Sequence, residues 1–159
     1  MYYSTNYSSP LGEMLFVSDG ESICGIWFCG QKYFKNNIDE TTKRDDLAIF
    51  KKLTKWFDDY FSGLNPAIDF KLNPQGSEFR QKVWKILREI PYGETLTYGE
   101  IASKISPTMS AQAVGGAVGH NPISILIPCH RVLGANGKLT GYAGGLDRKV
   151  ELLKLEQII

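Results

Sequence analysis

Residues 123–132 read Ile-Ser-Ile-Leu-Ile-Pro-Cys-His-Arg-Val, in which an apolar run ends at a proline and a cysteine and a histidine follow directly. A cysteine thiol has an ordinary pKa of about 8.5, and a nearby imidazole or cation can lower that pKa and release the nucleophilic thiolate. The alternative interpretation is that Cys129 is a small buried hydrophobic residue at the end of a strand. The pair Cys129 and His130 alone favours the buried hydrophobic residue, so the surrounding sequence has to decide.

The composition is that of a soluble globular protein with one domain or two small ones. Of its 159 residues, 43% are hydrophobic and 22% are charged. The longest apolar runs are too short to span a bilayer and the N-terminus does not resemble a signal peptide, so we expect no membrane association. Three cysteines at irregular positions predict no disulfide framework and favour a reducing, cytoplasmic setting, or a nuclear one in a eukaryote.

The net charge is weak support for nucleic-acid binding. It is +1, whereas nucleic-acid-binding domains are often strongly basic. Residues 1–73 carry 8 Lys and Arg against 10 Asp and Glu, and residues 74–159 carry 10 against 7. Any contact with a polyanion is therefore expected in the second half.

The first half predicts a small α/β domain. Residues 2–30 read as β structure, with a hairpin turn signalled by Asp-Gly at 19–20. Apolar residues recur every three or four positions from 45 to 61, which predicts a helix that stops near Gly63. Two Asn-Pro pairs in residues 64–76 indicate a linker, and we place the domain boundary between 73 and 74.

The first two cysteines raise the question of a metal site. Cys24 and Cys29 lie close in sequence, but a zinc site needs about four ligands, and the first 119 residues contain no histidine. We therefore interpret both cysteines as strand-packing residues.

The second half, residues 74–159, predicts a mainly helical domain, so the whole chain is of the α/β (α+β) class. Ser77 is the expected N-cap of a helix to about residue 89, and Thr97 and Glu100 form the pattern of a capping box for a short helix over 98–105. A further helix is expected over 110–118, and the two short helices suggest a helix-turn-helix. The last helix is expected over 147–158, where Glu156 is either exposed or a buried carboxylate that orients an imidazole.

The helix expected over 110–118 consists almost entirely of small residues. Gly115 and Gly116 each cost about 1 kcal/mol relative to alanine in a helix, so something should approach the backbone closely. Tight packing on a neighbouring element and close approach to the narrow minor groove of DNA are both consistent with this composition. No Lys or Arg occurs between residues 105 and 130, so a DNA contact here would depend on backbone N–H groups and shape.

Ordered motifs in the second half resemble the O6-alkylguanine-DNA alkyltransferases, also called methylated-DNA–protein-cysteine methyltransferases. The Pro-Cys-His-Arg-Val segment at 128–132 is similar to the active-site motif of that family. The likeness runs from about Phe79 to Glu156 through further segments at 91–95, 97–100, 113–115, 121–122 and 141–146. The first half resembles the small N-terminal α/β domain of the family much more loosely.

The resemblance implies direct reversal of DNA damage, in one turnover per molecule and without a metal or cofactor. A monomeric protein of this family binds double-stranded DNA through the minor groove and flips the alkylated guanine out of the stack. The alkyl group of O6-alkylguanine, with O4-alkylthymine as a second candidate, then moves irreversibly to Cys129.

The resemblance also implies three sets of site residues. In the catalytic set, His130 activates Cys129 through a water, Glu156 polarises His130, Tyr98 donates toward the base, Lys149 assists and Asn121 is a hinge. The DNA-binding set comprises Thr97, Ala111, Gln112, Ala113, Gly115 and Arg131. The substrate pocket is expected to be lined by Pro128, Val132, Tyr142 and Ala143.

One position departs from the family pattern. Gln112 stands where the family usually carries an arginine that enters the base stack. Because glutamine lacks the charge and the planar fork of arginine, we expect an effect on DNA binding or base flipping more than on alkyl transfer. Two other functions stay open, namely a non-catalytic module that recognises alkylated DNA and a cysteine hydrolase that uses Cys129.

Overall fold

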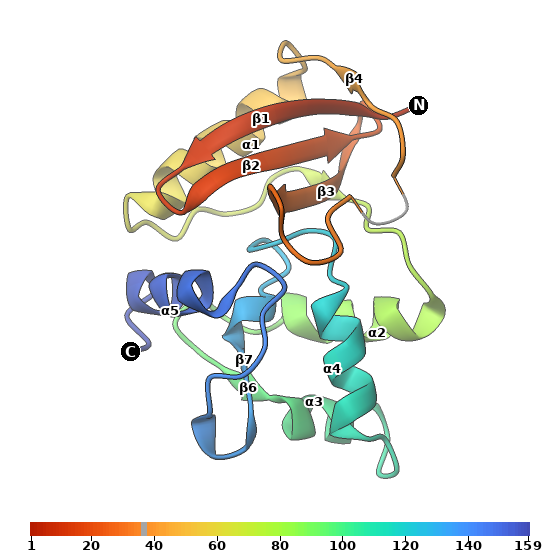
Figure 1. Ribbon diagram of the computed structural model, residues 1–159, viewed down its shortest axis with the longest axis vertical. Coiled ribbons are helices and arrows are strands. Elements are labelled where there is room, and N and C mark those ends of the chain that lie inside the picture. The colour runs from red at the N-terminus through yellow and green to blue at the C-terminus, as the bar shows by residue number, and fades with distance from the viewer. Residues whose placement is uncertain (36–37) are drawn as a thin grey trace. The chain divides into compact units, whose positions relative to one another are not determined.

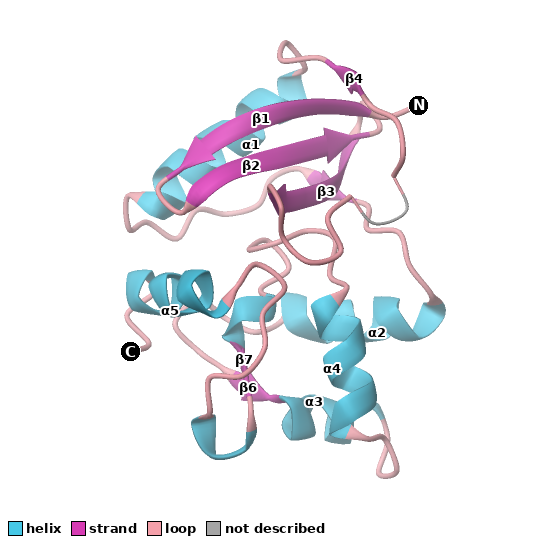
Figure 2. Cartoon of the chain, in the orientation of Figure 1, coloured by secondary structure: helices cyan, strands magenta, loops and turns pink. Residues whose placement is uncertain are grey.

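The structure is a computed structural model that describes residues 1–35 and 38–159. The chain forms two compact units, which are Met1–Gln75 with Pro122–Ser124, and Gly76–Asn121 with Ile125–Ile159. Figure 1 labels the elements along the chain, and Figure 2 shows that strands dominate the first unit and helices the second. The predicted α/β class is confirmed by this arrangement. The predicted boundary between 73 and 74 lies close to the division but left Pro122–Ser124 in the second half.

The first unit is built on a five-stranded sheet with the strand order β4-β1-β2-β3-β5. Strands β1 (Tyr3–Ser9), β2 (Gly12–Ser18) and β3 (Ser22–Phe28) form an antiparallel meander. Short parallel strands, β4 (Thr42–Lys43) beside β1 and β5 (Lys71–Leu72) beside β3, form its edges. The hairpin predicted between residues 14 and 28 is therefore present.

The turn of that hairpin is held by an aspartate side chain. Asp19 Oδ1 accepts hydrogen bonds from the backbone N–H groups of Glu21 (2.9 Å) and Ser22 (2.8 Å). Gly20 has a φ of +105°, which a residue with a Cβ rarely adopts. The Asp-Gly pair thus supplies both the hydrogen bonds and the backbone freedom that the turn needs.

Helix α1 (Ala48–Phe61) packs on the sheet but starts later than its pattern predicts. The pattern begins at Asp45, whose carboxylate accepts a hydrogen bond from Thr5 Oγ1 at 2.6 Å. Asp46 is paired with Arg44 at 2.8 Å. Because both aspartates are engaged in the preceding loop, the helix begins only after them.

The two cysteines of the first unit differ in environment. Cys24 is buried in a cluster with Val17 and Trp27, as a strand-packing residue should be. Cys29 is exposed just beyond the end of β3, so the packing interpretation was wrong for this residue. The strand ends one residue too early to bury it.

Pro122–Ser124 extend the sheet of the first unit from a distant part of the sequence. The backbone N–H of Ile26 donates to the carbonyl of Pro122 (2.8 Å), and Ser124 N–H donates to the carbonyl of Ile26 (3.0 Å). These bonds form a parallel bridge between Ile26 and Ile123. The segment that leads to Cys129 is therefore anchored to β3 by this isolated bridge.

The second unit begins with helix α2 (Glu78–Arg88), for which Ser77 is the N-cap, as predicted. Its Trp84 is buried and donates from Nε1 to the carbonyl of Ala117 in α4 at 2.9 Å. A Cβ at Gly76 would lie 2.4 Å from the Trp84 ring, so only glycine fits there. Trp84 thus fixes α2 against the helix of small residues that contains Ala117.

Helices α3 (Tyr98–Ile105) and α4 (Ala111–Gly119) form the predicted helix-turn-helix. The expected capping box is present, because Thr97 Oγ1 accepts from Glu100 N–H and the Glu100 carboxylate accepts from Thr97 N–H. Ser110 caps α4 by accepting from the backbone N–H of Ala113.

The remaining elements surround the segment that begins at Cys129. A 3-10 turn, η1 (Cys129–Arg131), leads into β7 (Val132–Leu133), which pairs in parallel with β6 (Leu96–Thr97). A second 3-10 turn, η2 (Ala135–Gly137), opens a glycine-rich loop that ends at helix α5 (Leu146–Leu155). Helix α5 is shorter than predicted, so Glu156 caps the helix rather than lying within it.

In the parts of the chain that the structure describes, no helix combines the length and apolar character required to cross a membrane.

Candidate active site

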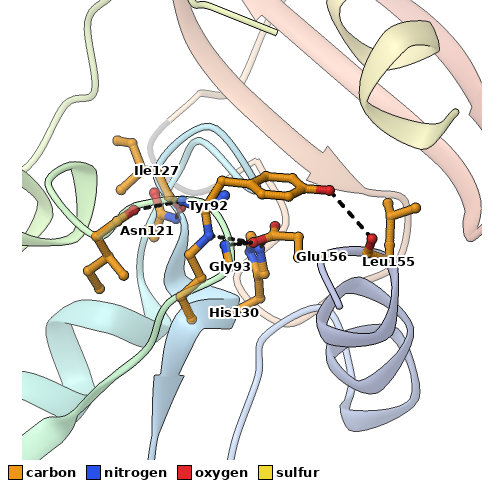
Figure 3. A network of polar contacts seen from close by, with 9 residues as sticks. Tyr92, Gly93, Asn121, Ile127, His130, Leu155 and Glu156 are labelled. Atoms are coloured by element: carbon orange, nitrogen blue, oxygen red, sulfur yellow. Dashed lines mark hydrogen bonds and ion pairs between the residues drawn. The ribbon is translucent and has the colours of Figure 1, made fainter. Parts of the chain in front are cut away.

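The backbone at Cys129 is fixed by a tight turn centred on Pro128. The N–H of Cys129 donates to the carbonyl of Ile127 at 2.8 Å, and Pro128 has φ −81° and ψ 66°, which defines an inverse γ-turn. Asn121 Nδ2 donates to the same carbonyl at 2.7 Å (Figure 3). Asn121, which follows α4, therefore ties the helix-turn-helix to the turn that presents Cys129.

The loop before this turn contains a backbone outlier. Ile125 has a φ of +73° and is buried. A β-branched residue in this region is strained by about 1–3 kcal/mol, and such strain persists only where the surroundings impose it.

The side chain of Cys129 is enclosed, with a relative exposure of 6% for the residue. Burial raises the pKa of its thiol, while a hydrogen bond with Asn121 and the positive charge of Lys149 oppose the rise. The thiol is thus mostly protonated at neutral pH and needs a base to take up its proton.

His130, the residue after Cys129, forms a buried pair with Glu156. His130 Nε2 lies 2.6 Å from Glu156 Oε2, and both side chains have no exposed surface (Figure 3). The carboxylate fixes the proton on Nε2, which leaves Nδ1 as an acceptor. Within the described residues, Nδ1 has no hydrogen-bond partner. Burial lowers the pKa of His130, with Glu156 opposing this shift, so the imidazole is available as a neutral base.

The second oxygen of Glu156 is held by two donors. Arg131 Nε donates to Oε1 at 2.7 Å, and the backbone N–H of Gly93 donates to it at 3.4 Å. Arg131 also donates from Nη1 to the carbonyl of Ile90 at 2.7 Å. The guanidinium thus joins the Glu156 carboxylate to the turn that follows α2.

Lys149 is fully buried and closes the glycine-rich loop. Its Nζ donates to the carbonyls of Val132 (2.6 Å), Thr140 (3.0 Å) and Gly141 (3.1 Å). Burial lowers the pKa of Lys149 to about 8. The amine therefore stays mostly protonated at neutral pH, with three donors for three acceptors.

Two tyrosines lie within electrostatic reach of Cys129. Burial raises the pKa of both Tyr98 and Tyr142, and the charge of a Cys129 thiolate raises each pKa further. The Tyr142 hydroxyl is enclosed and has no partner among the described residues, and a Cβ on Gly141 would lie 4.0 Å from the Tyr98 hydroxyl. Both phenols therefore remain protonated at neutral pH.

Two family models together match almost the whole chain. Residues 78–158 match the 6-O-methylguanine DNA methyltransferase, DNA binding domain, and residues 1–74 match the 6-O-methylguanine DNA methyltransferase, ribonuclease-like domain. The chain belongs to the 6-O-methylguanine DNA methyltransferase family. The resemblance inferred from the Pro-Cys-His-Arg-Val motif is thereby confirmed.

Members of the 6-O-methylguanine DNA methyltransferase family are similar to this chain over nearly its full length. A methylated-DNA–protein-cysteine methyltransferase of Haemophilus influenzae is 48% identical and covers 98% of this chain and 87% of its own. One from Mycolicibacterium paratuberculosis is 59% identical over 94% of this chain and 88% of its own. The crystal structure of Mycobacterium tuberculosis OGT in complex with DNA is similar with a TM-score of 0.83 and 40% identity, covering 98% of this chain and 92% of that chain.

The structure brings the predicted catalytic residues together in the second unit. Hydrogen bonding or electrostatic coupling links Cys129 to Tyr98, Asn121 and Lys149. His130, the next residue in sequence, is paired with Glu156 and is coupled to Lys149. Of the predicted pocket residues, Tyr142 faces the same centre, Val132 contributes its carbonyl to Lys149, Pro128 forms the turn and Ala143 is half-buried. Their chemical roles stay predictions.

The predicted DNA-binding residues do not all share one surface. Ala111, Gln112 and Ala113 are exposed along the first turn of α4, and Gly115 is half-buried. Thr97 uses its hydroxyl to cap α3.

Arg131 is held by partners inside the protein, and its expected contact with DNA stays a prediction. Its guanidinium side chain is only 11% exposed, because it is paired with Glu156 and with the carbonyl of Ile90. Ile90 and Gly93 were not predicted as site residues, because they contribute only backbone groups. Residues 91–93 lie in a segment that carries the family resemblance, but nothing in the sequence indicates that this turn faces Glu156.

Proposed function

We propose that this chain repairs DNA by direct reversal, moving the alkyl group of O6-alkylguanine to the sulfur of Cys129 in a single turnover. The observation that carries the proposal is that the buried Cys129 is followed directly by His130, which is paired with Glu156 through Nε2 and whose Nδ1 is available to accept a proton. Membership of the 6-O-methylguanine DNA methyltransferase family supports the same reaction.

The proposed chemistry uses one base and one acid. The Cys129 proton passes through a water to Nδ1 of His130, and Glu156 stabilises the imidazolium that forms. The thiolate then attacks the alkyl carbon, a C–S bond forms and the bond from that carbon to the guanine oxygen breaks. The bonding electrons go to guanine, which is a better leaving group when Tyr98 donates a proton to the base. The thioether is stable, so the protein is consumed.

In this proposal, α4 is the element that contacts DNA next to the Cys129 site. The exposed side chains at the start of that helix and the two small residues Gly115 and Gly116 fit the minor groove, and a base flipped from the stack would enter beside Tyr98. The proposal takes the protein to be a monomer, with O4-alkylthymine as a secondary substrate. A reactive thiol is best preserved in a reducing compartment, which supports a cytoplasmic or nuclear location.

The test is a mass measurement on the intact protein. The chain is incubated with duplex DNA that contains one O6-methylguanine, and Cys129→Ser and undamaged DNA serve as controls. We expect one methyl group per protein molecule, carried by the peptide that contains Cys129, and no gain in either control.

Two outcomes would contradict the proposal. DNA binding without any gain in mass indicates a non-catalytic module for recognising alkylated DNA. Repeated turnover of an ester substrate, with no mass retained on Cys129, indicates a cysteine hydrolase.

A further inference from the structure

We propose that Arg131 is a positioning residue for the alkyl transfer, because it holds one oxygen of Glu156 and so fixes the other oxygen on His130. The inference rests on the proposed function and assigns Arg131 a task inside the protein in place of the DNA contact expected from sequence. The contacts, the burial and the charges around Glu156 each support it.

The contacts of Arg131 are directional and come from two parts of one side chain. Nε donates to Glu156 Oε1 at 2.7 Å, and Nη1 donates to the carbonyl of Ile90 at 2.7 Å. The guanidinium carbon also lies 5.8 Å from the centre of the Tyr92 ring. Three neighbours thus fix the plane of the guanidinium, which in turn fixes the plane of the carboxylate.

The Pro-Tyr-Gly turn adds a second restraint on the same oxygen. The N–H of Gly93 donates to Glu156 Oε1 at 3.4 Å, a contact that Figure 3 marks with a dashed line. Oε1 therefore accepts from Arg131 and from Gly93, while Oε2 lies 2.6 Å from His130 Nε2. A lysine at position 131 could reach either Glu156 or Ile90 but lacks the fork that joins them.

The positive charge of Arg131 should have a measurable effect on the pKa of His130. Burial lowers the pKa of His130, Glu156 raises it, and the positive charges of Arg131 and Lys149 lower it further. Tyr92 and Tyr142 interact with Glu156 and are uncharged when protonated, and Arg148 acts on Tyr142. Without Arg131, the full negative charge of Glu156 acts on His130, so the pKa of His130 should rise. More of the imidazole is then protonated at neutral pH and unable to accept the thiol proton.

An NMR titration tests this effect without relying on activity. The chain has only two histidines, so His120→Gln assigns the His130 signal. In Arg131→Met we expect the titration midpoint of His130 to rise by about one pH unit, and in Arg131→Lys, which keeps the charge, by less. Arg88→Met removes an exposed arginine of α2 and should leave the midpoint unchanged. An unchanged midpoint in Arg131→Met would overturn the proposal.

The single-turnover rate of alkyl transfer, measured across pH, distinguishes positioning from simple loss of structure. The acid limb of the Arg131→Met profile should shift to higher pH, so that the deficit is about tenfold near pH 6 and shrinks at alkaline pH. An equal deficit at every pH would mean a purely structural role and would contradict the inference. If the wild-type protein gains no alkyl group at all, the proposed function fails, while the titration still decides the role of Arg131.

Discussion

Lys149 is a buried charge near the Cys129 thiol, and its hydrogen bonds explain how the fold tolerates that charge. An ionised amine without partners would be very unfavourable in the interior, but each of its three N–H donors has a carbonyl acceptor. With all three donors engaged, Lys149 has no donor left for a substrate. We therefore infer that it assists by closing the glycine-rich loop and by placing positive charge near Cys129.

Replacement of Lys149 by methionine tests both contributions. Lys149→Met leaves the carbonyls of Val132, Thr140 and Gly141 without that donor, so the free energy of unfolding should fall by about 2–4 kcal/mol. The pKa of Cys129 should rise, because the Lys149 charge opposes the effect of burial. Urea denaturation measures the first effect and the ultraviolet absorbance of the thiolate across pH measures the second. Lys85→Met on the exposed face of α2 is the control, and a loss no larger than in this control would contradict the account.

Two glycines of helix α4, Gly115 and Gly116, are not explained by packing within the chain. A Cβ at Gly116 would have nothing within 4 Å, and one at Gly115 would make only ordinary contact with the Tyr98 ring at 3.9 Å. Tight packing therefore does not require either glycine. The remaining explanation is the close approach of an outside partner, which for this family is DNA.

Gly116→Ala separates the fold from DNA binding. Alanine is favoured over glycine in a helix, so the variant should gain up to about 1 kcal/mol of stability in thermal or urea unfolding. The added methyl group projects from an exposed position and should weaken binding to duplex DNA, as measured by fluorescence anisotropy. Gly99→Ala, at an exposed position of α3 with room for a methyl group, controls for the gain in stability. A more stable Gly116→Ala protein with unchanged DNA affinity would show that DNA does not approach this helix closely.

The elements that the sequence predicted are those specified by local chemistry. The Asp-Gly turn, the Ser77 cap and the capping box of α3 each depend on residues within a few positions of one another. The pairing of β6 with β7 was not predicted, because each strand has two residues and its partner is distant in sequence. The bonds of Pro122–Ser124 to β3 were missed for the same reason. The contacts of Arg131 with Glu156 and with the carbonyl of Ile90 were not predicted, because no sequence pattern reveals a backbone carbonyl as a partner.

The charge distribution of the whole chain limits the electrostatic contribution to DNA binding. The net charge is only +1, and no Lys or Arg occurs between residues 105 and 130. The exposed start of α4, including Gln112, therefore offers no cation to a phosphate or to an orphaned base. Affinity for DNA should come more from shape and backbone N–H groups than from released counterions, so its dependence on salt should be shallow.

Gln112→Arg adds a positive charge at the exposed start of α4, where the wild-type chain has no cation. The new guanidinium lies on the exposed first turn of α4, where it can pair with a phosphate or replace a flipped base. We expect tighter binding at low salt, a slope of log affinity against log salt that is steeper by about one, and faster alkyl transfer. Binding is measured at several salt concentrations, and transfer by single-turnover kinetics. Gln81→Arg on α2 adds the same charge elsewhere and should change the slope less. If the affinity, the salt slope and the transfer rate all stay as in the wild type, Gln112 does not limit DNA binding. The shape of α4 would then have to explain how the flipped base reaches Cys129.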